Sequence, residues 1–239
     1  MKQAVNPDDF IVSRKRKKYK FAMFFNSSLC FEYDEFLSDN RPKLADFQNI
    51  TLEVGAGTGL FSVELAARHP QRAFIAIDVK ADRLQKGAYE AEARGLENVW
   101  FVRARADQID ELFEPASIAT IWLTFPDPFP RPRSARRRLT HPLYLHKYAL
   151  LLQGSTLGKV KNYDFGNVYL KHDNLNFFTW SLEQLVQQHW DITELSFDLH
   201  DSMLDDEYKT KTTYEIRWLN EGLTTKFVKA GKTKNSELH

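Results

Sequence analysis

The amino-acid sequence predicts an α/β protein whose core is a doubly wound, mostly parallel sheet. From residue 50 onward, short apolar runs alternate with segments of helical periodicity, which is the pattern of βαβ units. One of these runs, residues 118–125, is almost continuously apolar, as expected for a parallel strand covered on both faces. The glycine turn Gly55-Ala56-Gly57-Thr58-Gly59 joins the first run to the first helical segment. Such sheets bind ligands at the carboxyl ends of their strands, which is where this turn lies.

Composition limits the classes of protein to which the chain can belong. Its 239 residues, 43% of them hydrophobic, are enough for one α/β domain with appendages. The net charge of +1 means that any nucleic-acid surface must be local. A single cysteine, Cys30, excludes an internal disulfide and a thiolate-rich metal site. Since no apolar run approaches the roughly 18 residues of a membrane span, and the first residues lack an apolar signal core, we expect a cytoplasmic protein without membrane segment or metal.

The elements of the sheet are expected in alternating order. Seven strands are predicted, at residues 52–54, 73–78, 99–102, 118–125, 168–170, 192–199 and 214–219. The intervening helices are predicted at residues 60–68, 81–94 (closed by Gly95 at its C′ position), 107–113, 143–152 and 177–189. Because a charged loop, and not a helix, joins the last two strands, they are expected to form an antiparallel hairpin at the sheet edge. Residues 154–167, which include the tract 155–166, have weak periodicity and are expected to be an inserted loop.

Three segments are expected along the chain. Residues 1–20 end in a dense basic run, and because like charges repel, this arm is expected to be flexible without a partner. Residues 21–228 are expected to form a single domain that opens with an aromatic-rich, partly helical segment at 21–48. Residues 229–239 are expected to be a disordered tail.

The glycine turn suits a ligand with a nucleoside and a carboxylate or phosphate. Its glycines let backbone N–H groups approach a ligand closely, and a helix start adds unpaired N–H groups and partial positive charge. Asp78, at the end of the second strand, can accept both hydroxyls of a ribose, and Glu53 can reach the ligand through water. These features are shared by nicotinamide and S-adenosylmethionine enzymes. The spacing G-A-G-T-G departs from the dinucleotide pattern G-x-G-x-x-G and favours S-adenosylmethionine.

A proline-rich segment follows the fourth strand. In Phe125-Pro126-Asp127-Pro128-Phe129-Pro130, the prolines restrict the backbone on both sides of Asp127 and fix its carboxylate at the strand end. Five arginines follow within eight residues: Arg131, Arg133, Arg136, Arg137 and Arg138. A fixed carboxylate beside a cluster that can bind phosphates indicates a methyl acceptor carried on a polynucleotide. The alternative is a charged surface loop with no such role.

These motifs resemble the tRNA (guanine-N7)-methyltransferase family. The resemblance rests on Glu-Val-Gly-Ala-Gly-Thr-Gly at 53–59, on Phe-Pro-Asp-Pro-Phe-Pro at 125–130, and on Arg-Arg-Arg-Leu at 136–139. Leu-Lys-His-Asp-Asn at 170–174, Thr-Thr-Tyr-Glu-Ile-Arg at 212–217 and the basic run at 14–18 agree with it. It implies a Rossmann-like class I fold that uses S-adenosylmethionine to methylate N7 of guanine 46 in the variable loop of tRNA. The protein is expected to act as a monomer or homodimer.

The resemblance also implies roles for individual residues. Asp127 would be catalytic. The cofactor would be bound by Glu53, Gly55, Gly57, Gly59, Asp78, Asp107 and Asp127. The guanine or its neighbours would be bound by Arg131, Asp173, Thr212, Tyr214 and Glu215. Phosphates of tRNA would be bound by Arg14, Lys15, Arg16, Lys17, Lys18, Arg133, Arg136, Arg137 and Arg138.

Several positions depart from the family pattern. Arg105 stands where an Asp or Asn near the adenine is usual, so Asp107 would have to substitute for it. Arg131 replaces a lysine, Ser134 a histidine, and His172 a threonine. Three carboxyl and hydroxyl side chains also have simpler interpretations: Asp173 as a helix N-cap or turn carboxylate, Glu215 as a cross-strand ion pair, and Thr212 as an ordinary strand residue. His172 is interpreted as an incidental loop histidine.

The implied reaction needs no general base, because N7 of neutral guanine carries a lone pair and no proton. Catalysis would come from alignment and from electrostatic support of the cationic product, a role that suits Asp127. Two alternatives remain open from the sequence. One is a non-catalytic RNA-binding relative, which the Arg105 departure favours, and the other is a nicotinamide-dependent reductase.

Overall fold

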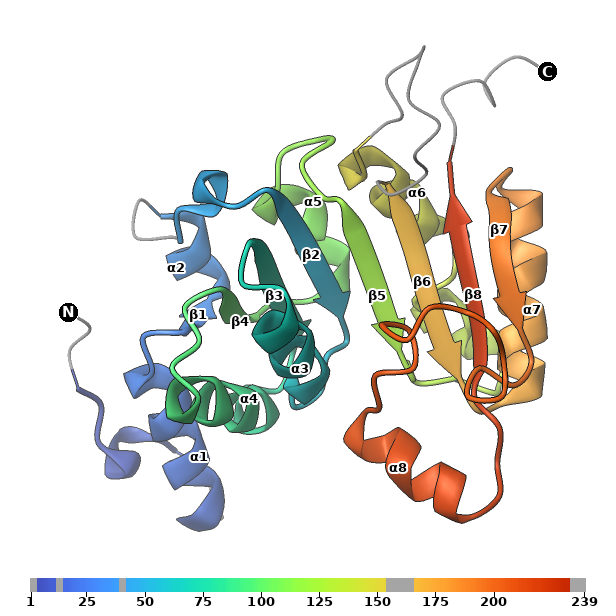
Figure 1. Cartoon of the computed structure of the whole chain (residues 1–239). Coiled ribbons are helices and arrows are strands. Elements are labelled where there is room, and N and C mark those ends of the chain that lie inside the picture. Colours follow the sequence, from blue (N-terminus) through green and yellow to red (C-terminus); the bar gives the residue numbers. More distant parts are fainter. Residues whose placement is uncertain (1–3, 12–14, 39–41, 154–165, 233–239) are drawn as a thin grey trace. The chain divides into compact units, whose positions relative to one another are not determined.

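The computed structural model describes residues 4–11, 15–38, 42–153 and 166–232 (Figure 1). The chain divides into two compact units, Met1–Gln108 and Ile109–His239. The inserted loop expected at 154–167 lies, apart from Gly166 and the strand residue Asn167, outside the described residues. Among the helices of the described ranges, none has the length and apolarity needed to cross a bilayer.

The first unit is built on four parallel strands in the order β1-β4-β3-β2. The helices α3 and α4 pack against each other and against β3 and β4 (Figure 1). Its elements are η1 (Pro7–Asp9), α1 (Lys15–Asn26), β1 (Cys30–Glu32), α2 (Tyr33–Leu37), η2 (Leu44–Asp46), β2 (Asn49–Val54), α3 (Leu60–Arg68), β3 (Arg72–Asp78), α4 (Ala81–Ala93), β4 (Val99–Arg103) and η3 (Ala106–Gln108).

The start of the chain is folded onto the first unit. Residues 15–20, expected in a mobile arm, form the first turns of α1, which packs on α4. The Phe10 ring lies 5.7 Å from the Phe21 ring and 5.4 Å from the Phe25 ring. The Asn26 side chain accepts a hydrogen bond from the Val5 N–H at 2.7 Å and donates one to the Val5 carbonyl at 3.0 Å. Residues 5–10 therefore hold α1 by aromatic contacts and by hydrogen bonds between the Val5 backbone and the Asn26 side chain.

The second unit is a mixed sheet in the order β5-β6-β8-β7. β5 and β6 are parallel, and β8 pairs antiparallel with both β6 and β7. Figure 1 shows α7 beside the edge strand β7. Its elements are α5 (Ile109–Leu112), β5 (Thr120–Thr124), η4 (Pro132–Arg137), α6 (Pro142–Leu151), β6 (Asn167–His172), α7 (Leu175–Gln187), β7 (Asp191–Ser196), α8 (Thr213–Asn220) and β8 (Lys226–Gly231).

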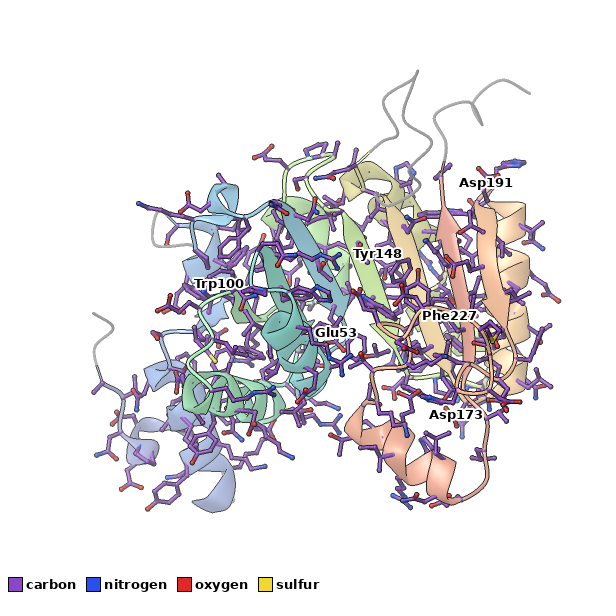
Figure 2. All side chains as sticks on the ribbon, in the orientation of Figure 1. Glu53, Trp100, Tyr148, Asp173, Asp191 and Phe227 are labelled. Atoms are coloured by element: carbon purple, nitrogen blue, oxygen red, sulfur yellow. The ribbon has the colours of Figure 1, made fainter. Side chains whose placement is uncertain are left out.

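An aromatic cluster forms part of the core of the second unit. The Trp122 and Tyr169 rings lie 4.7 Å apart, and the Tyr208 and Phe227 rings stack at 4.6 Å; Figure 2 labels Phe227 on β8. Lys229 Nζ donates to Glu194 Oε1 at 2.9 Å and lies 5.7 Å from the centre of the Tyr169 ring. The Tyr208 hydroxyl donates to Glu194 Oε1 at 3.3 Å, so the loop that carries Tyr208 is fastened to the sheet by ring contacts and a hydrogen bond.

Two predicted elements near the C-terminus are wrong. Residues 214–219, predicted as the last strand, lie in α8, because a capping box starts a helix at Thr212. The antiparallel strand is instead β8, whose backbone pairs with β6 on one side and β7 on the other. Residues 229–231, expected in the tail, are therefore part of the sheet. The described residues hold four strands in each unit, where seven were predicted in all, and the added strand is the short β1.

Gly87 permits close contact between α4 and the glycine turn. A Cβ at this position would lie 2.4 Å from the Thr58 carbonyl oxygen and 2.5 Å from Cε1 of Phe101. The carbonyl belongs to the backbone of the turn and cannot move without displacing it. The packing of the first unit therefore requires glycine within this helix, although glycine ordinarily weakens a helix interior.

We expect Gly87→Ala to destabilise the protein by about 1–3 kcal/mol, the cost typical of overpacking. In a helix without this contact, the same change stabilises by roughly 1 kcal/mol. Urea unfolding of the two proteins measures the difference. Lys86→Ala, at the neighbouring exposed position, is the control and is expected to change stability by less than about 0.5 kcal/mol. A stabilised Gly87→Ala protein would contradict this packing argument.

Candidate functional site

The glycine turn of the first unit is held by hydrogen bonds from its own backbone. The N–H groups of Gly55 and Ala56 both donate to the Ile77 carbonyl at 2.9 Å. Gly55, Gly57 and Gly59 have φ values of 76°, 59° and 69°, in the left-handed region that favours glycine. A Cβ on Gly59 would lie 2.5 Å from Cε1 of Phe101, whereas a Cβ on Gly57 would meet no atom within 4 Å. Gly59 is thus needed for packing and backbone conformation, and Gly57 for conformation alone.

Glu53 is anchored directly behind the turn, and Figure 2 labels it near the carboxyl end of β2. Its side chain is buried, and Oε2 accepts a hydrogen bond from the Ser62 hydroxyl of α3 at 2.6 Å. The carboxylate therefore joins the strand that enters the turn to the helix that leaves it.

Asp78 connects the end of β3 to the turn. Its Oδ2 accepts from the Gly57 N–H and its Oδ1 from the Lys80 N–H, both at 2.9 Å. Burial raises the pKa of this carboxyl, although the two backbone donors oppose the effect. A carboxylate oxygen has two lone pairs, so each oxygen keeps acceptor capacity for a ligand hydroxyl.

Asp107 is paired with Arg105, the residue that departs from the family pattern. The Arg105 guanidinium binds the Asp107 carboxylate through two nitrogens, with Nε 2.9 Å from Oδ1. The Arg105 N–H donates to Gln108 Oε1 at 2.9 Å. The Asp107 carboxylate is therefore already bound by Arg105. The predicted contact of Asp107 with an adenine stays a prediction.

The segment around Asp127 in the second unit is strained and firmly held, while Asp127 itself is exposed. Phe125 and Phe129 have φ values of 50° and 39°, which is costly for residues with a side chain and is typical of functional sites. The Phe125 N–H donates to the Lys171 carbonyl at 2.9 Å. The Pro126 carbonyl lies 2.9 Å from Nε2 of His172. The loop thus presents an exposed carboxylate on a fixed backbone.

The arginines after this loop divide into two groups. Arg138 donates to the Pro128 carbonyl at 3.0 Å and to the Phe129 carbonyl at 3.1 Å, and its guanidinium lies 4.3 Å from the centre of the Trp180 ring. The Arg137 guanidinium lies 4.4 Å from the centre of the Phe129 ring. Arg138 holds the Asp127 loop, and its predicted contact with phosphate stays a prediction. The other three, Arg131, Arg133 and Arg136, are exposed, and so is Arg137.

Lys171 and Glu215 form an ion pair with no exposed side-chain surface. Lys171 Nζ donates to Glu215 Oε2 at 2.7 Å and to the Thr210 carbonyl at 2.8 Å. Glu215 Oε2 also accepts from the Thr212 N–H at 3.1 Å, and Oε1 lies 2.8 Å from Nε2 of His200. Both carboxylate oxygens are therefore bound to protein groups. The predicted cross-strand ion pair is wrong, since Glu215 lies in a helix.

Thr212 and Tyr214 lie at the start of the same helix. The Thr212 hydroxyl accepts from the Glu215 N–H at 3.0 Å, so Thr212 is the N-cap of α8 and not a strand residue. Tyr214 is 49% exposed. Of the three residues predicted on this motif to contact guanine, Tyr214 has the most accessible side chain.

Asp173 and His172 lie at the carboxyl end of β6, where Figure 2 labels Asp173. The N-cap of α7 is Asn174, whose side chain accepts from the Phe177 N–H at 2.9 Å, so the interpretation of Asp173 as the cap is wrong and that of a turn carboxylate stays open. Asp173 keeps a partly exposed carboxylate, 3.3 Å from Nδ1 of His172. His172 is 3% exposed and belongs to the strand, so it is not an incidental loop residue.

The basic run is described only in part. Arg14 lies outside the described residues, and Lys15 and Arg16 begin α1. Lys17 is exposed, with Nζ 5.6 Å from the centre of the Phe21 ring, and Lys18 Nζ lies 3.8 Å from Asp8 Oδ1.

In the described part of the chain, no group of three or more His, Cys, Asp or Glu side chains is placed to hold a metal ion.

Sequence reasoning does not identify the residues that hold the glycine turn within the first unit and the Asp127 loop within the second. Lys171, Arg138 and Gly87 were passed over or assigned elsewhere because lysine and arginine are ordinarily exposed, and a single helical glycine is ordinarily tolerated. Local signals existed for Glu215, because Thr-x-x-Glu before apolar residues is a capping box.

Comparison with known proteins identifies the family. The family model described as "Putative methyltransferase" matches residues 47–228. The tRNA (guanine-N(7)-)-methyltransferase of Cytophaga hutchinsonii is 33% identical over 201 residues, which cover 83% of each chain. That of Bacteroides fragilis is 33% identical over 94% of this chain and 88% of its own, and that of Brevibacillus brevis 35% identical over 72% and 76%.

Solved structures agree on the fold. The 16S rRNA methyltransferase KamB has a TM-score of 0.58 at 14% identity and covers 80% of this chain and 90% of its own. A variant of the 16S rRNA (adenine(1408)-N(1))-methyltransferase of Catenulisporales acidiphilia, solved with its cosubstrate SAM, has a TM-score of 0.54 at 12% identity and covers 82% and 91%. At these identities the similarity shows the Rossmann-like methyltransferase fold. With the matched sequence relatives, it shows that the chain is an enzyme belonging to the tRNA (guanine-N7)-methyltransferase family.

Proposed function

We propose that this enzyme transfers the methyl group of S-adenosylmethionine to N7 of guanine in tRNA, with guanine 46 of the variable loop as its target. The observation that carries the proposal is the family match over residues 47–228, which includes both the glycine turn and the Asp127 loop. Relatives that share a third of their residues with this chain are named for that reaction. The nicotinamide-dependent reductase considered from the sequence is not supported, because it leaves the Asp127 loop without a role.

The residues of the glycine turn fit S-adenosylmethionine. Three glycines with positive φ keep the turn free of side chains at those positions, and Asp78 retains acceptor capacity for ribose hydroxyls. Glu53 is assigned to the support of the turn, since Ser62 of α3 already binds it. When bound, the cofactor supplies an electrophilic methyl group on a positively charged sulfur.

Asp127 is assigned to the guanine. The base gains positive charge as N7 forms its bond to carbon, and a fixed exposed anion stabilises that charge more in the transition state than in the ground state. Hydrogen bonds to the loop carbonyls keep this anion in place, although the backbone is strained at Phe125 and Phe129. No proton has to be removed from N7, so the carboxylate acts by charge and by hydrogen bonding to the base edge.

The tRNA backbone is assigned to exposed cations of the second unit and of α1. Arg131, Arg133 and Arg136 are exposed after the Asp127 loop. Lys17 is exposed on α1, and its partner Phe21 is a neutral ring, so no carboxylate competes in that contact. Deleting residues 1–20 would remove half of α1, which packs on α4, so substitutions test the basic run better than truncation.

The reaction is tested directly by incubating unmodified tRNA with the enzyme and S-adenosylmethionine, then digesting the tRNA and analysing its nucleosides and fragments by mass spectrometry. The expected product is 7-methylguanosine in the fragment that contains position 46. Another methylated nucleoside would overturn the proposed atom, and 7-methylguanosine in another fragment would overturn the proposed position. The absence of any methylated product with a binding-competent tRNA would overturn the activity.

We expect Asp127→Asn to lower kcat by roughly 100-fold or more, the cost of removing one preorganised electrostatic group. The variant keeps the size and polarity of the side chain and loses only its charge. Affinity for S-adenosylhomocysteine, measured by calorimetry, is expected to stay within twofold. Asp201→Asn, at an exposed aspartate of the same unit, is the matched control. Wild-type kcat in Asp127→Asn would remove Asp127 from the mechanism.

We expect the double variant Arg133→Gln/Arg136→Gln to bind tRNA with a salt dependence reduced by about one to two units in the slope of log K against log salt. Each phosphate contact that the variant lacks reduces the number of counterions released when tRNA binds. The control is Arg94→Gln, because Arg94 is engaged by Glu64 at 2.7 Å. Filter binding across a salt series measures the slopes. Equal slopes for wild type and the double variant would mean that these arginines do not contact the backbone.

We expect Glu215→Gln to lower the free energy of unfolding by about 3–5 kcal/mol, because it leaves the buried Lys171 ammonium without its counter-charge. Glutamine can still accept from the Thr212 N–H, so the helix cap is retained. Thr212→Ala, which removes only the cap, is expected to cost about 1 kcal/mol. Urea unfolding separates the two. If Glu215 serves mainly as a guanine contact, Glu215→Gln will instead keep wild-type stability and raise KM for tRNA.

A further inference from the structure

His172 joins the end of β6 to the backbone directly before Asp127. Its Nε2 lies 2.9 Å from the Pro126 carbonyl oxygen, and its Nδ1 lies 2.8 Å from the Asn174 N–H. The ring is 3% exposed and packs 4.5 Å from the Phe177 ring. The His172 backbone is paired with Lys226 of β8, so the ring is held on the sheet from several sides.

These two contacts define the protonation state of the ring. A carbonyl oxygen only accepts hydrogen bonds, so Nε2 carries a hydrogen and donates it to Pro126. The Asn174 N–H only donates, so Nδ1 carries a lone pair and accepts. The neutral form with hydrogen on Nε2 satisfies both. Burial lowers the pKa of His172, against opposing effects of the Pro126 carbonyl and of the nearby Asp173 and Asp127 carboxylates, and with Lys226 adding to the lowering.

The Pro126 carbonyl belongs to the same rigid peptide plane as the Asp127 N–H. A donor that fixes this oxygen therefore fixes the orientation of the plane from which the Asp127 side chain departs. On the other side, Pro128 restricts Asp127 to extended backbone conformations. Because the Pro126–Asp127 peptide plane is held by His172 and Pro128 follows, the direction of the Asp127 Cα–Cβ bond is restricted.

Together these contacts lead us to propose that His172 is a positioning residue for the methyl transfer, which orients the Asp127 carboxylate through its Nε2–H bond to the Pro126 carbonyl. This inference rests on the proposed function of Asp127 and adds a residue to it. The device needs a side chain with two separated polar atoms at this position, and a shorter hydroxyl side chain could not span both contacts of the ring.

Two amide variants separate the two contacts. In His172→Asn the amide oxygen occupies about the place of Nδ1, so it can accept from the Asn174 N–H but offers no donor to Pro126. In His172→Gln the longer amide brings an N–H to about the place of Nε2 and keeps the donor to Pro126. Both variants lose the packing of the aromatic ring. A difference between them therefore reports the donor to Pro126 and not the lost packing.

We expect His172→Asn to lower kcat by about 10- to 100-fold, while KM for tRNA and affinity for S-adenosylhomocysteine change less than about twofold, because alignment contributes mainly in the transition state. We expect His172→Gln to recover most of that loss. Wild-type kcat in His172→Asn would overturn the proposal. The proposal would also be overturned if both variants lost kcat only in proportion to their loss of stability, because a purely structural role predicts that result.

An activity-independent readout keeps this test apart from that of the proposed function. In the two-dimensional NMR spectrum of the full chain, the Asp127 amide signal is expected to shift and to broaden in His172→Asn but to stay near its wild-type position in His172→Gln. An unchanged Asp127 signal in both variants overturns the positioning role even if the wild-type enzyme makes 7-methylguanosine. A wild-type enzyme that makes no methylated product while the Asp127 signal responds as expected overturns the proposed function and leaves the hydrogen bond established.

Discussion

The buried ion pair between Lys171 and Glu215 is the constraint on which the second unit depends. Neither side chain has exposed surface, and taking two charges out of water is unfavourable unless their geometry and hydrogen bonds offset the cost. The Lys171 side chain fixes the start of α8, while its carbonyl holds the Phe125 N–H at the beginning of the Asp127 loop. The neighbouring His172 holds the same loop one residue later. Two consecutive residues of β6 thereby tie a loop and a helix, distant in sequence, to one strand end.

The glycine turn of the first unit is held by a different kind of constraint. Its backbone is fixed by N–H donors to the Ile77 carbonyl and to Asp78, and by the close approach of Gly87 on α4. Close packing of backbone against backbone leaves no room for adjustment by side-chain rotation. The turn is rigid because glycine allows contacts that a Cβ would prevent, whereas the Asp127 loop is rigid despite unfavourable φ values. The first arrangement depends on small residues and the second on long polar side chains.

The sequence predicts most of this fold because the first strands and helices follow simple periodicities. Residues 60–68 and 73–78 match α3 and β3 within a residue, since the glycine turn and the apolar runs are local signals. Prediction failed at α8, where Tyr214, Ile216 and Trp218 alternate as in a strand. Thr212 and Glu215 decide the outcome there, because their capping box starts a helix and the buried Lys171 holds it. That lysine could not be recognised, since its burial depends on a partner 44 residues away.

Burial separates the residues of the family motifs into those that bind protein groups and those that can reach a ligand. Motif similarity identifies which positions matter, but it does not say whether a carboxylate meets a ligand or the protein. Glu215 has both oxygens bound within the protein and no exposed surface, so its carboxylate serves the capping box and the ion pair that hold α8. Asp127 is exposed on a strained backbone whose carbonyls are held from two sides. Since a group must be accessible to touch a base and fixed to stabilise a transition state, Asp127 meets both requirements, and the buried polar residues around it supply the second.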